Sequence, residues 1–316
     1  MNLWASLKRP EYIFRPTQII RRVVCELSHT SAGYETVRLP WGLPIRVRPN
    51  ETIGSCIRRL GIHDLASSEL ITRLVDPGEV VVDVGANIGH MVSLLALRAG
   101  PNGKVIAIEP HPTVFSELQY NIEAWKQVRD LAPIVAHNLA LTNFTGVAQL
   151  IVPRDFDNNC GLSYLATGDD HPNLQEAFYQ VPVNTLDVVV GAEERISFLK
   201  IDVEGHELAV LKGAQNLMLT GRIRDILFEE ERPVPTPVTE FLEDCGYTIY
   251  RVDCNLFAPT ISPLKTPSLR VVDDAPNYLA TRDPHRTIAR MSKRGWMVYS
   301  GTWRQWKQLP KDSAVT

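Results

Sequence analysis

Short apolar runs alternate with helix-length segments over most of this chain, and that alternation restricts its fold more than any other feature. The run EVVVDVG at residues 79–85 is rich in valine, as a strand buried on both faces should be. Strands separated by helices build an open, mostly parallel α/β sheet with helices on both faces. The predicted strands are residues 79–85, 104–109, 134–138, 147–152, 181–183, 196–203, 225–230 and 247–252.

Helices are expected where apolar periodicity runs on until Gly or Pro interrupts it. An amphipathic helix is predicted near the N-terminus at residues 18–27, and a short hairpin follows at 34–39 and 44–47. The other predicted helices are residues 61–75, 88–99, 112–127, 206–219 and 238–245.

Charge is distributed unevenly along the 316 residues. Residues 1–50 carry eight Lys/Arg against three acidic residues and residues 285–316 carry seven against one, yet the net charge is −3. The body between these basic ends is therefore acidic, and we expect it to bind no DNA.

The five cysteines include no CxxC pair, so neither a disulfide framework nor a structural zinc site is expected. The N-terminus lacks the apolar core of a signal peptide, and no window is a credible membrane span. These features predict a cytoplasmic protein.

A glycine-containing loop follows the first predicted strand, in the sequence VVVDVGANIGH at residues 80–90. Gly85 permits a sharp turn close to a ligand, and Gly89 permits close packing of the next helix on the strand. Asn87 stands where a dinucleotide site would have its middle glycine. Asp83 would repel a pyrophosphate and attract an ammonium group, so the loop favours S-adenosyl-L-methionine.

A second acidic residue, Glu109, ends the next predicted strand in the sequence IAIEP. A carboxylate at that place accepts hydrogen bonds from both hydroxyls of a ribose. His111 and Asn138, which ends the third strand, are then expected on the adenine side of the same cofactor site.

The segments VVVDVGANIGHMVSLLAL, VIAIEPHP, VPVNTLD, ISFLKIDVEGHELAVLKGA and ILFEEE, in this order and spacing, resemble the FkbM family of methyltransferases. The resemblance implies a class I methyltransferase (Rossmann-like) fold with S-adenosyl-L-methionine as donor. It also implies O-methylation of a hydroxyl on a sugar or small molecule. The expected division is a basic N-terminal extension with a short helix and hairpin (1–50), a methyltransferase domain (51–284) and a basic, aromatic C-terminal extension (285–316).

The stretch KIDVEGHE at residues 200–207 gathers ionisable side chains at the end of the fourth core strand. We interpret Asp202 as a group that positions the cofactor or the acceptor, and Glu204 or His206 as the acceptor of the hydroxyl proton. A purely structural alternative has the acids favour a helix N-terminus, with Lys200 paired to Glu204 or Glu207.

No metal site is assigned, although oxygen ligands suited to Mg²⁺ are an alternative reading of the same acids. That reading joins Asp202 and Glu204 to Glu229 or Glu230 from the neighbouring strand end.

The loop NNCGLSYL at residues 158–165 is expected above the same crevice, with Asn159, Gly161 and Ser163 as acceptor-binding residues. The alternative is an ordinary turn. Cys160 has no evident activating partner in the sequence, so it is not expected to act as a nucleophile.

The C-terminal segment 286–308 interleaves Lys and Arg with Trp and Tyr. We expect its aromatic side chains to pack on the body or in a homo-oligomer contact, and contact with a membrane surface or RNA is the alternative. For the whole chain, an RNA ribose-hydroxyl methyltransferase and a non-catalytic S-adenosyl-L-methionine-binding protein are the alternatives to a sugar or small-molecule O-methyltransferase.

Overall fold

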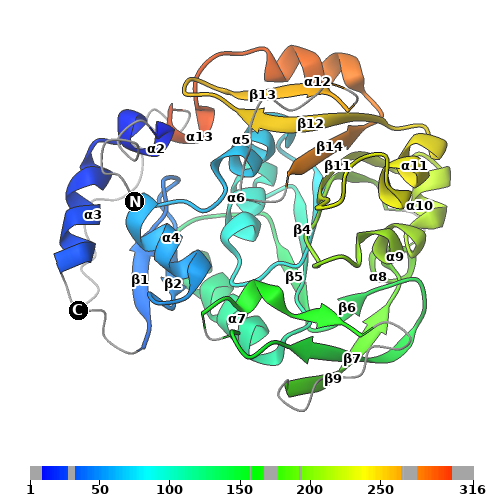
Figure 1. Cartoon of the computed structure of the whole chain (residues 1–316), viewed down its shortest axis with the longest axis horizontal. Helices are drawn as coiled ribbons and strands as arrows, with labels where there is room; N and C mark the ends of the chain where they lie inside the picture. The colour runs from blue at the N-terminus through cyan, green and yellow to red at the C-terminus, as the bar shows by residue number, and fades with distance from the viewer. Residues whose placement is uncertain are drawn as a thin grey trace.

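A computed structural model describes residues 9–27, 33–156, 158–166, 177–191, 194–264, 266 and 276–300. A central eight-stranded sheet organises this part of the chain, in the order β13-β12-β14-β11-β10-β3-β4-β5 (Figure 1). Its strands are β3 (Val80–Val84), β4 (Lys104–Ile108), β5 (Ile134–His137), β10 (Ile196–Ile201), β11 (Ile223–Glu229), β12 (Thr248–Cys254), β13 (Pro259–Pro263) and β14 (Asn277–Thr281).

The pairing directions confirm the predicted fold class. Neighbours among β5, β4, β3, β10 and β11 are all parallel, whereas β14 runs antiparallel to both β11 and β12. A parallel sheet that ends in antiparallel strands, with helices on both faces, is the class I methyltransferase architecture.

Alternate residues of each core strand enter different apolar cores, because successive side chains of a strand point to opposite faces. Val81 belongs to one core and Val82 to the other. The first core lies under α5 (Leu65–Leu74), α6 (His90–Ala99) and α7 (Pro112–Lys126). The second lies under α8 (Leu186–Val190), α9 (Glu207–Lys212), α10 (Gln215–Leu219) and α11 (Pro237–Asp244).

Two predicted strands lie outside the central sheet. Residues 147–152 fall in β7 (Gly146–Val152) and 181–183 in β9 (Ala177–Asn184), which pair antiparallel with each other. With β6 (Ala140–Leu141) and β8 (Tyr164–Leu165) they form a separate four-stranded sheet. This smaller sheet lies beside the carboxyl end of β5 and carries the loop at 158–165 (Figure 1).

The predicted helix at 61–75 was wrong at its start. Gly61, at φ 80°, ends a preceding helix α4 (Thr52–Leu60), and the Asp64 side chain caps α5 by accepting the Ser67 N–H. The predicted helix at 206–219 is divided into α9 and α10 at Gly213, which ends α9 and packs against the backbone of Thr142.

Both end segments of the described chain contact the body. The hairpin of β1 (Glu35–Arg38) and β2 (Pro44–Val47) forms where predicted, and its turn buries Trp41, whose indole N–H donates to Ser93 on α6 at 3.0 Å. Helices α2 (Pro10–Phe14) and α3 (Thr17–Leu27) precede it. At the other end, α12 (Pro284–Met291) and α13 (Met297–Ser300) flank the buried Trp296, whereas Trp303 and Trp306 lie outside the described residues. Within the described part, no helix combines the length and apolar character that crossing a bilayer requires.

Candidate active site

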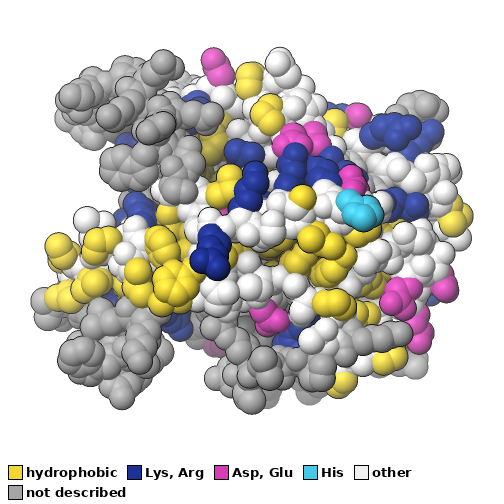
Figure 2. All heavy atoms as spheres, turned by 90° about the horizontal axis from the view of Figure 1, so that it is seen from above, with side chains coloured by type: hydrophobic (Ala, Val, Ile, Leu, Met, Phe, Trp, Pro, Cys, Tyr) yellow, Lys and Arg dark blue, Asp and Glu magenta, His cyan; other side chains and the backbone are white. Residues whose placement is uncertain are grey.

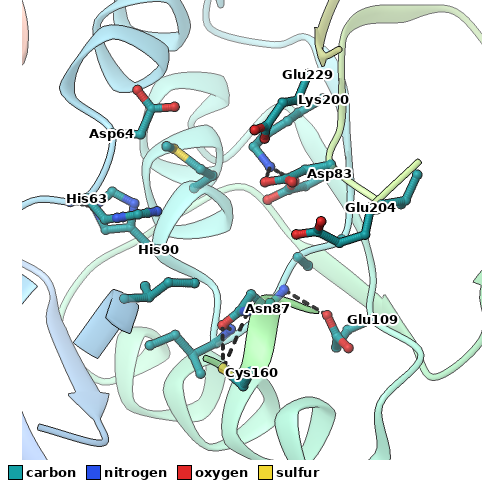
Figure 3. Close-up of a pocket in the computed structure, with 18 of the residues that line it drawn as sticks. His63, Asp64, Asp83, Asn87, His90, Glu109, Cys160, Lys200, Glu204 and Glu229 are labelled. Carbon is teal, nitrogen blue, oxygen red and sulfur yellow. Dashed lines mark hydrogen bonds and ion pairs between the residues drawn. The ribbon is translucent and has the colours of Figure 1, made fainter. Parts of the chain in front are cut away.

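A cavity of about 730 Å³ opens at the carboxyl ends of β3, β4, β10 and β11. Side chains from the glycine loop, the ends of these strands and the turn before α5 face one another across it (Figure 3). The predicted site residues that line it are Asp83, Gly85, Asn87, Glu109, Asn159, Gly161, Ser163, Asp202, Glu204 and His206.

The glycine loop is shaped by contact with the neighbouring strand end. Gly85 has φ 80°, and a Cβ on it would lie 1.9 Å from the carbonyl oxygen of Asp202, so no larger residue fits. Asn87 has φ 49°, and its backbone N–H donates to the Glu109 carboxylate at 2.9 Å. The loop and the second strand end are thereby tied into one surface.

Asp83 is fully buried in the cavity wall, and neither of its carboxylate oxygens has a hydrogen-bond partner among the described residues. Its nearest countercharge is the Lys200 ammonium, at 3.7 Å from Oδ1. Burial raises the pKa of Asp83 to about 6, although Lys200 opposes the shift. A buried carboxylate without hydrogen bonds is unfavourable unless a ligand supplies a positive donor.

Glu109 offers the second acidic group of the cavity. Its two oxygens accept the backbone N–H groups of Asn87 and His111, at 2.9 and 2.8 Å, and each oxygen keeps a lone pair for a further donor. Burial raises the pKa of Glu109 to about 7 despite these bonds. Asp83 for a cationic group and Glu109 for a diol therefore fit S-adenosyl-L-methionine.

Three residues assigned to the cofactor site from the sequence do not line the cavity. Gly89, at φ 94°, is packed against Leu118 and Trp125 of α7. The His111 ring caps α7 through its Nδ1 and stacks on Phe156 at 4.3 Å. The Asn138 side-chain amide donates to the carbonyls of residues 109 and 110, both at 2.9 Å, and so stabilises the turn after β4.

The fourth core strand ends at Ile201, two residues earlier than predicted. Lys200 pairs with Asp202 at 2.8 Å and with Asp83 at 3.7 Å, and not with Glu204 or Glu207 as in the structural alternative. Although burial opposes ionisation, Lys200 lowers the pKa of Asp202. Asp202 therefore stays ionised at neutral pH.

Glu204 reaches the cavity through a turn and not through strand alternation, because its φ is 47° and Gly205 follows at 83°. Its carboxylate has no hydrogen bond or ion pair with any described residue. The side chain is exposed at the edge of the cavity, and partial loss of solvent there, and then the charge of Asp202, raises its pKa to about 7. The His206 ring instead contacts the Thr142 hydroxyl at 3.0 Å through Nε2, and burial lowers its pKa.

Glu229, at the end of β11, lies beside Lys200, on the same side of the cavity as Glu204 (Figure 3). Burial, followed by the charges of Asp202 and Glu204, raises its pKa to about 8. Glu230 turns away and pairs with Arg232 at 2.9 Å. Within the described ranges, no group of three or more His, Cys, Asp or Glu side chains has the geometry of a metal site.

The loop at 158–165 is attached to the glycine loop. Cys160 Sγ lies 3.7 Å from the Asn87 amide nitrogen, and burial raises the pKa of this thiol to about 12, which leaves no reactive thiolate. The Asn159 side chain accepts the Gly161 N–H at 3.1 Å, and the buried Ser163 hydroxyl has no partner in the part of the chain described.

Sequence reasoning missed one wall of the cavity, formed by His63, Asp64 and His90 (Figure 3). Asp64 is the N-cap of α5, and a D-x-x-S pattern marks it in the sequence, but nothing there places it beside the strand ends. Burial holds the pKa of His90 well below its usual value, so this ring is neutral.

Comparison with known proteins identifies the family that the sequence resembles. The family model for the methyltransferase FkbM domain matches residues 83–249. Methyltransferase sdnD of Sordaria araneosa is 30% identical over 201 residues, which are 54% of this chain and 74% of that protein. Hexuronic acid methyltransferase AglP of Haloferax volcanii is 28% identical over 192 residues, which are 58% and 71% of the two chains.

Among solved structures, methyltransferase FkbM from Methylobacillus flagellatus KT aligns with a TM-score of 0.42 and 17% identity. That match covers 65% of this chain and 44% of the other. The family match extends over more than half of the chain and includes Asp83, Glu109, Asp202 and Glu204. The chain therefore belongs to the FkbM family and is an S-adenosyl-L-methionine-dependent methyltransferase.

Proposed function

We propose that the enzyme methylates a hydroxyl of a sugar or of another small polyhydroxylated metabolite. The observation that carries this proposal is the pair of carboxyl groups, Glu204 and Glu229, which line the cavity beyond the ends of β10 and β11 and make no hydrogen bond or ion pair with a described side chain. Carboxyl groups in this situation hydrogen-bond sugar hydroxyls readily. The similarity to a relative named for a hexuronic acid supports a carbohydrate acceptor.

When bound, S-adenosyl-L-methionine would supply a methyl group to the acceptor oxygen, and its sulfur would keep the electrons of the broken carbon–sulfur bond as a neutral thioether. The protein must then hold the acceptor oxygen in line with that methyl group and take up the hydroxyl proton. Asp202, kept ionised by Lys200, accepts a hydrogen bond from the acceptor and orients it.

Glu204 takes the proton. Its raised pKa, about 7, is close to the working pH, which is the condition for an efficient general base. His206 is less suited to that role, because its Nε2 is engaged with Thr142 and burial lowers its pKa.

The test is methyl transfer from labelled donor to separate pools of sugars and glycans, other small metabolites, and RNA. We expect label in the first or second pool, and Glu204→Gln should lower the rate by about 10²–10⁴-fold while donor binding is kept. Glu243→Gln, an exposed site on α11, is the matched control.

Other outcomes decide between the alternatives. Label confined to RNA would establish a ribose-hydroxyl methyltransferase instead. Tight donor binding with no label in any pool would favour a non-catalytic binding protein.

A further inference from the structure

Helix α3 turns its apolar side chains towards solvent. Ile20 is 68% exposed, Val24 57% and Val23 46%, whereas the polar Gln18 on the same helix is 3% exposed. A surface helix normally packs its apolar stripe on the protein and presents its polar face to water. In α3 the face that carries Gln18 packs on the protein and the apolar stripe is exposed to solvent, so this stripe is available to a partner.

Helix α2 contacts α3 and adds two exposed apolar side chains, Ile13 at 45% and Phe14 at 38%. We call Ile13, Phe14, Ile20, Val23 and Val24 the N-terminal apolar patch. Hydrophobic side chains gather at the left of Figure 2, at the end of the molecule where α2 and α3 lie in Figure 1. Scattered apolar side chains are normal on a surface, but a contiguous group indicates an interaction site.

The charges around the patch are mainly positive. Arg9 precedes α2, Arg15 lies between the two helices, and Arg21 and Arg22 belong to α3. Two acidic residues, Glu11 on α2 and Glu26 on α3, stand against these four arginines in the sequence, so the balance is positive.

The C-terminal basic segment starts at the same surface. The Arg15 guanidinium lies 6.0 Å from the ring centre of Tyr299 on α13, which joins the two ends of the described chain. The sequence that follows α13 carries Trp303, Arg304, Trp306 and Lys307. Those residues lie outside the described part of the chain, and the proposal does not depend on their positions.

We propose that the N-terminal apolar patch docks on an anionic lipid bilayer. Aliphatic and aromatic side chains beside Lys and Arg on an amphipathic helix are what interfacial membrane binding requires. A second copy related by two-fold symmetry would bring the same arginines together. RNA would leave the aliphatic side chains uncovered, since it binds through stacking on aromatic rings and through phosphates.

The test is co-sedimentation of the full-length protein with phosphatidylcholine vesicles that do or do not contain phosphatidylglycerol. We expect binding to the anionic vesicles that weakens as salt is added. Ile20→Glu with Val24→Glu should weaken that binding at least about tenfold, because two inserted apolar side chains become charged.

The matched control is Val188→Glu with Leu219→Glu, because these side chains are 63% and 66% exposed on α8 and α10. It should bind vesicles as the unmodified protein does. Unchanged melting temperature and donor affinity confirm that both double variants fold.

Three results overturn the proposal: no binding of the unmodified protein to anionic vesicles, equal binding by the Ile20/Val24 variant, or equal losses in both variants. Light scattering that shows a dimer split by Ile20→Glu with Val24→Glu, without vesicle binding, would assign the patch to a second copy. All of these outcomes are independent of the methyl acceptor, so the proposal stands apart from the proposed function.

Discussion

At the scale of single residues, two buried aspartates serve different ends: Asp83 is available to a ligand, and Asp225 stabilises the fold. Asp83 has no hydrogen bond among the described residues, whereas the buried Asp225 accepts from Thr281 at 2.6 Å and pairs with Arg224 and Arg286. We expect Asp83→Asn to raise the Kd for S-adenosyl-L-methionine by about ten- to a hundredfold, because it removes the countercharge for a cationic ligand. Calorimetry of donor binding measures this change.

Asp225→Asn is the control for that substitution. It should lower the free energy of unfolding by about 3–5 kcal/mol and leave the Kd of the folded protein unchanged, since it breaks a buried ion pair remote from the cavity. A loss of stability in Asp83→Asn with an unaltered Kd would contradict the assignment.

The raised pKa values predict a pH dependence of cofactor binding. Burial raises the pKa of Asp83 to about 6 and that of Glu109 to about 7, so both are largely protonated below these values in the free protein. The cationic donor favours the ionised carboxylates. Its affinity should therefore rise between about pH 5.5 and 8 and then level off, with protons released on binding.

Calorimetry in buffers of different ionisation enthalpy counts those protons. Affinity that falls as the pH rises would show that the two carboxylates do not contact the donor.

At the scale of elements, the apolar runs predicted β3, β4, β10 and β11 because these strands are buried on both faces. The sequence also predicted Asp83 and Glu109 as cavity residues, since parallel strands end at one edge of the sheet. The pairing of Lys200 with Asp83, the approach of Asp64, and strand β14 depend on contacts far apart in the chain. No local pattern encodes such contacts.

Gly213, at the end of α9, makes another contact of this long-range kind. A Cβ on Gly213 would lie 2.1 Å from the carbonyl oxygen of Thr142, so Gly213→Ala must displace backbone. We expect it to lower the free energy of unfolding by about 1–3 kcal/mol or more in urea titrations.

Gly78→Ala is the comparison, because Gly78 has φ 88° and nothing lies within 4 Å of its added Cβ. Only the backbone conformation is then unfavourable, at a cost of about 1 kcal/mol. Equal effects of the two substitutions would show that the contact with Thr142 does not matter.

At the scale of the whole molecule, a buried ion pair on α5 attaches the C-terminal segment. Arg73, paired with Glu69 at 2.7 Å, donates to the carbonyls of residues 290, 291, 293 and 295. Glu69 accepts the backbone N–H groups of Met297 and Val298. Arg73→Ala should therefore cost about 3–5 kcal/mol in the free energy of unfolding, measured by denaturant titration.

The exposed pair of Lys104 and Glu194 provides the contrast, since these side chains are 38% and 33% exposed. Lys104→Ala should cost less than about 1 kcal/mol. If the two alanine variants were equally stable, α5 would not be the anchor of the C-terminal segment.

The left-handed backbone conformation of Glu204 means that the residue best for turnover is not the residue best for the stability of the fold. Glycine and asparagine adopt φ 47° more easily than glutamate does, yet neither supplies its carboxylate. A randomised library sorted for heat resistance should accumulate glycine or asparagine there, whereas sorting for turnover should restore glutamate.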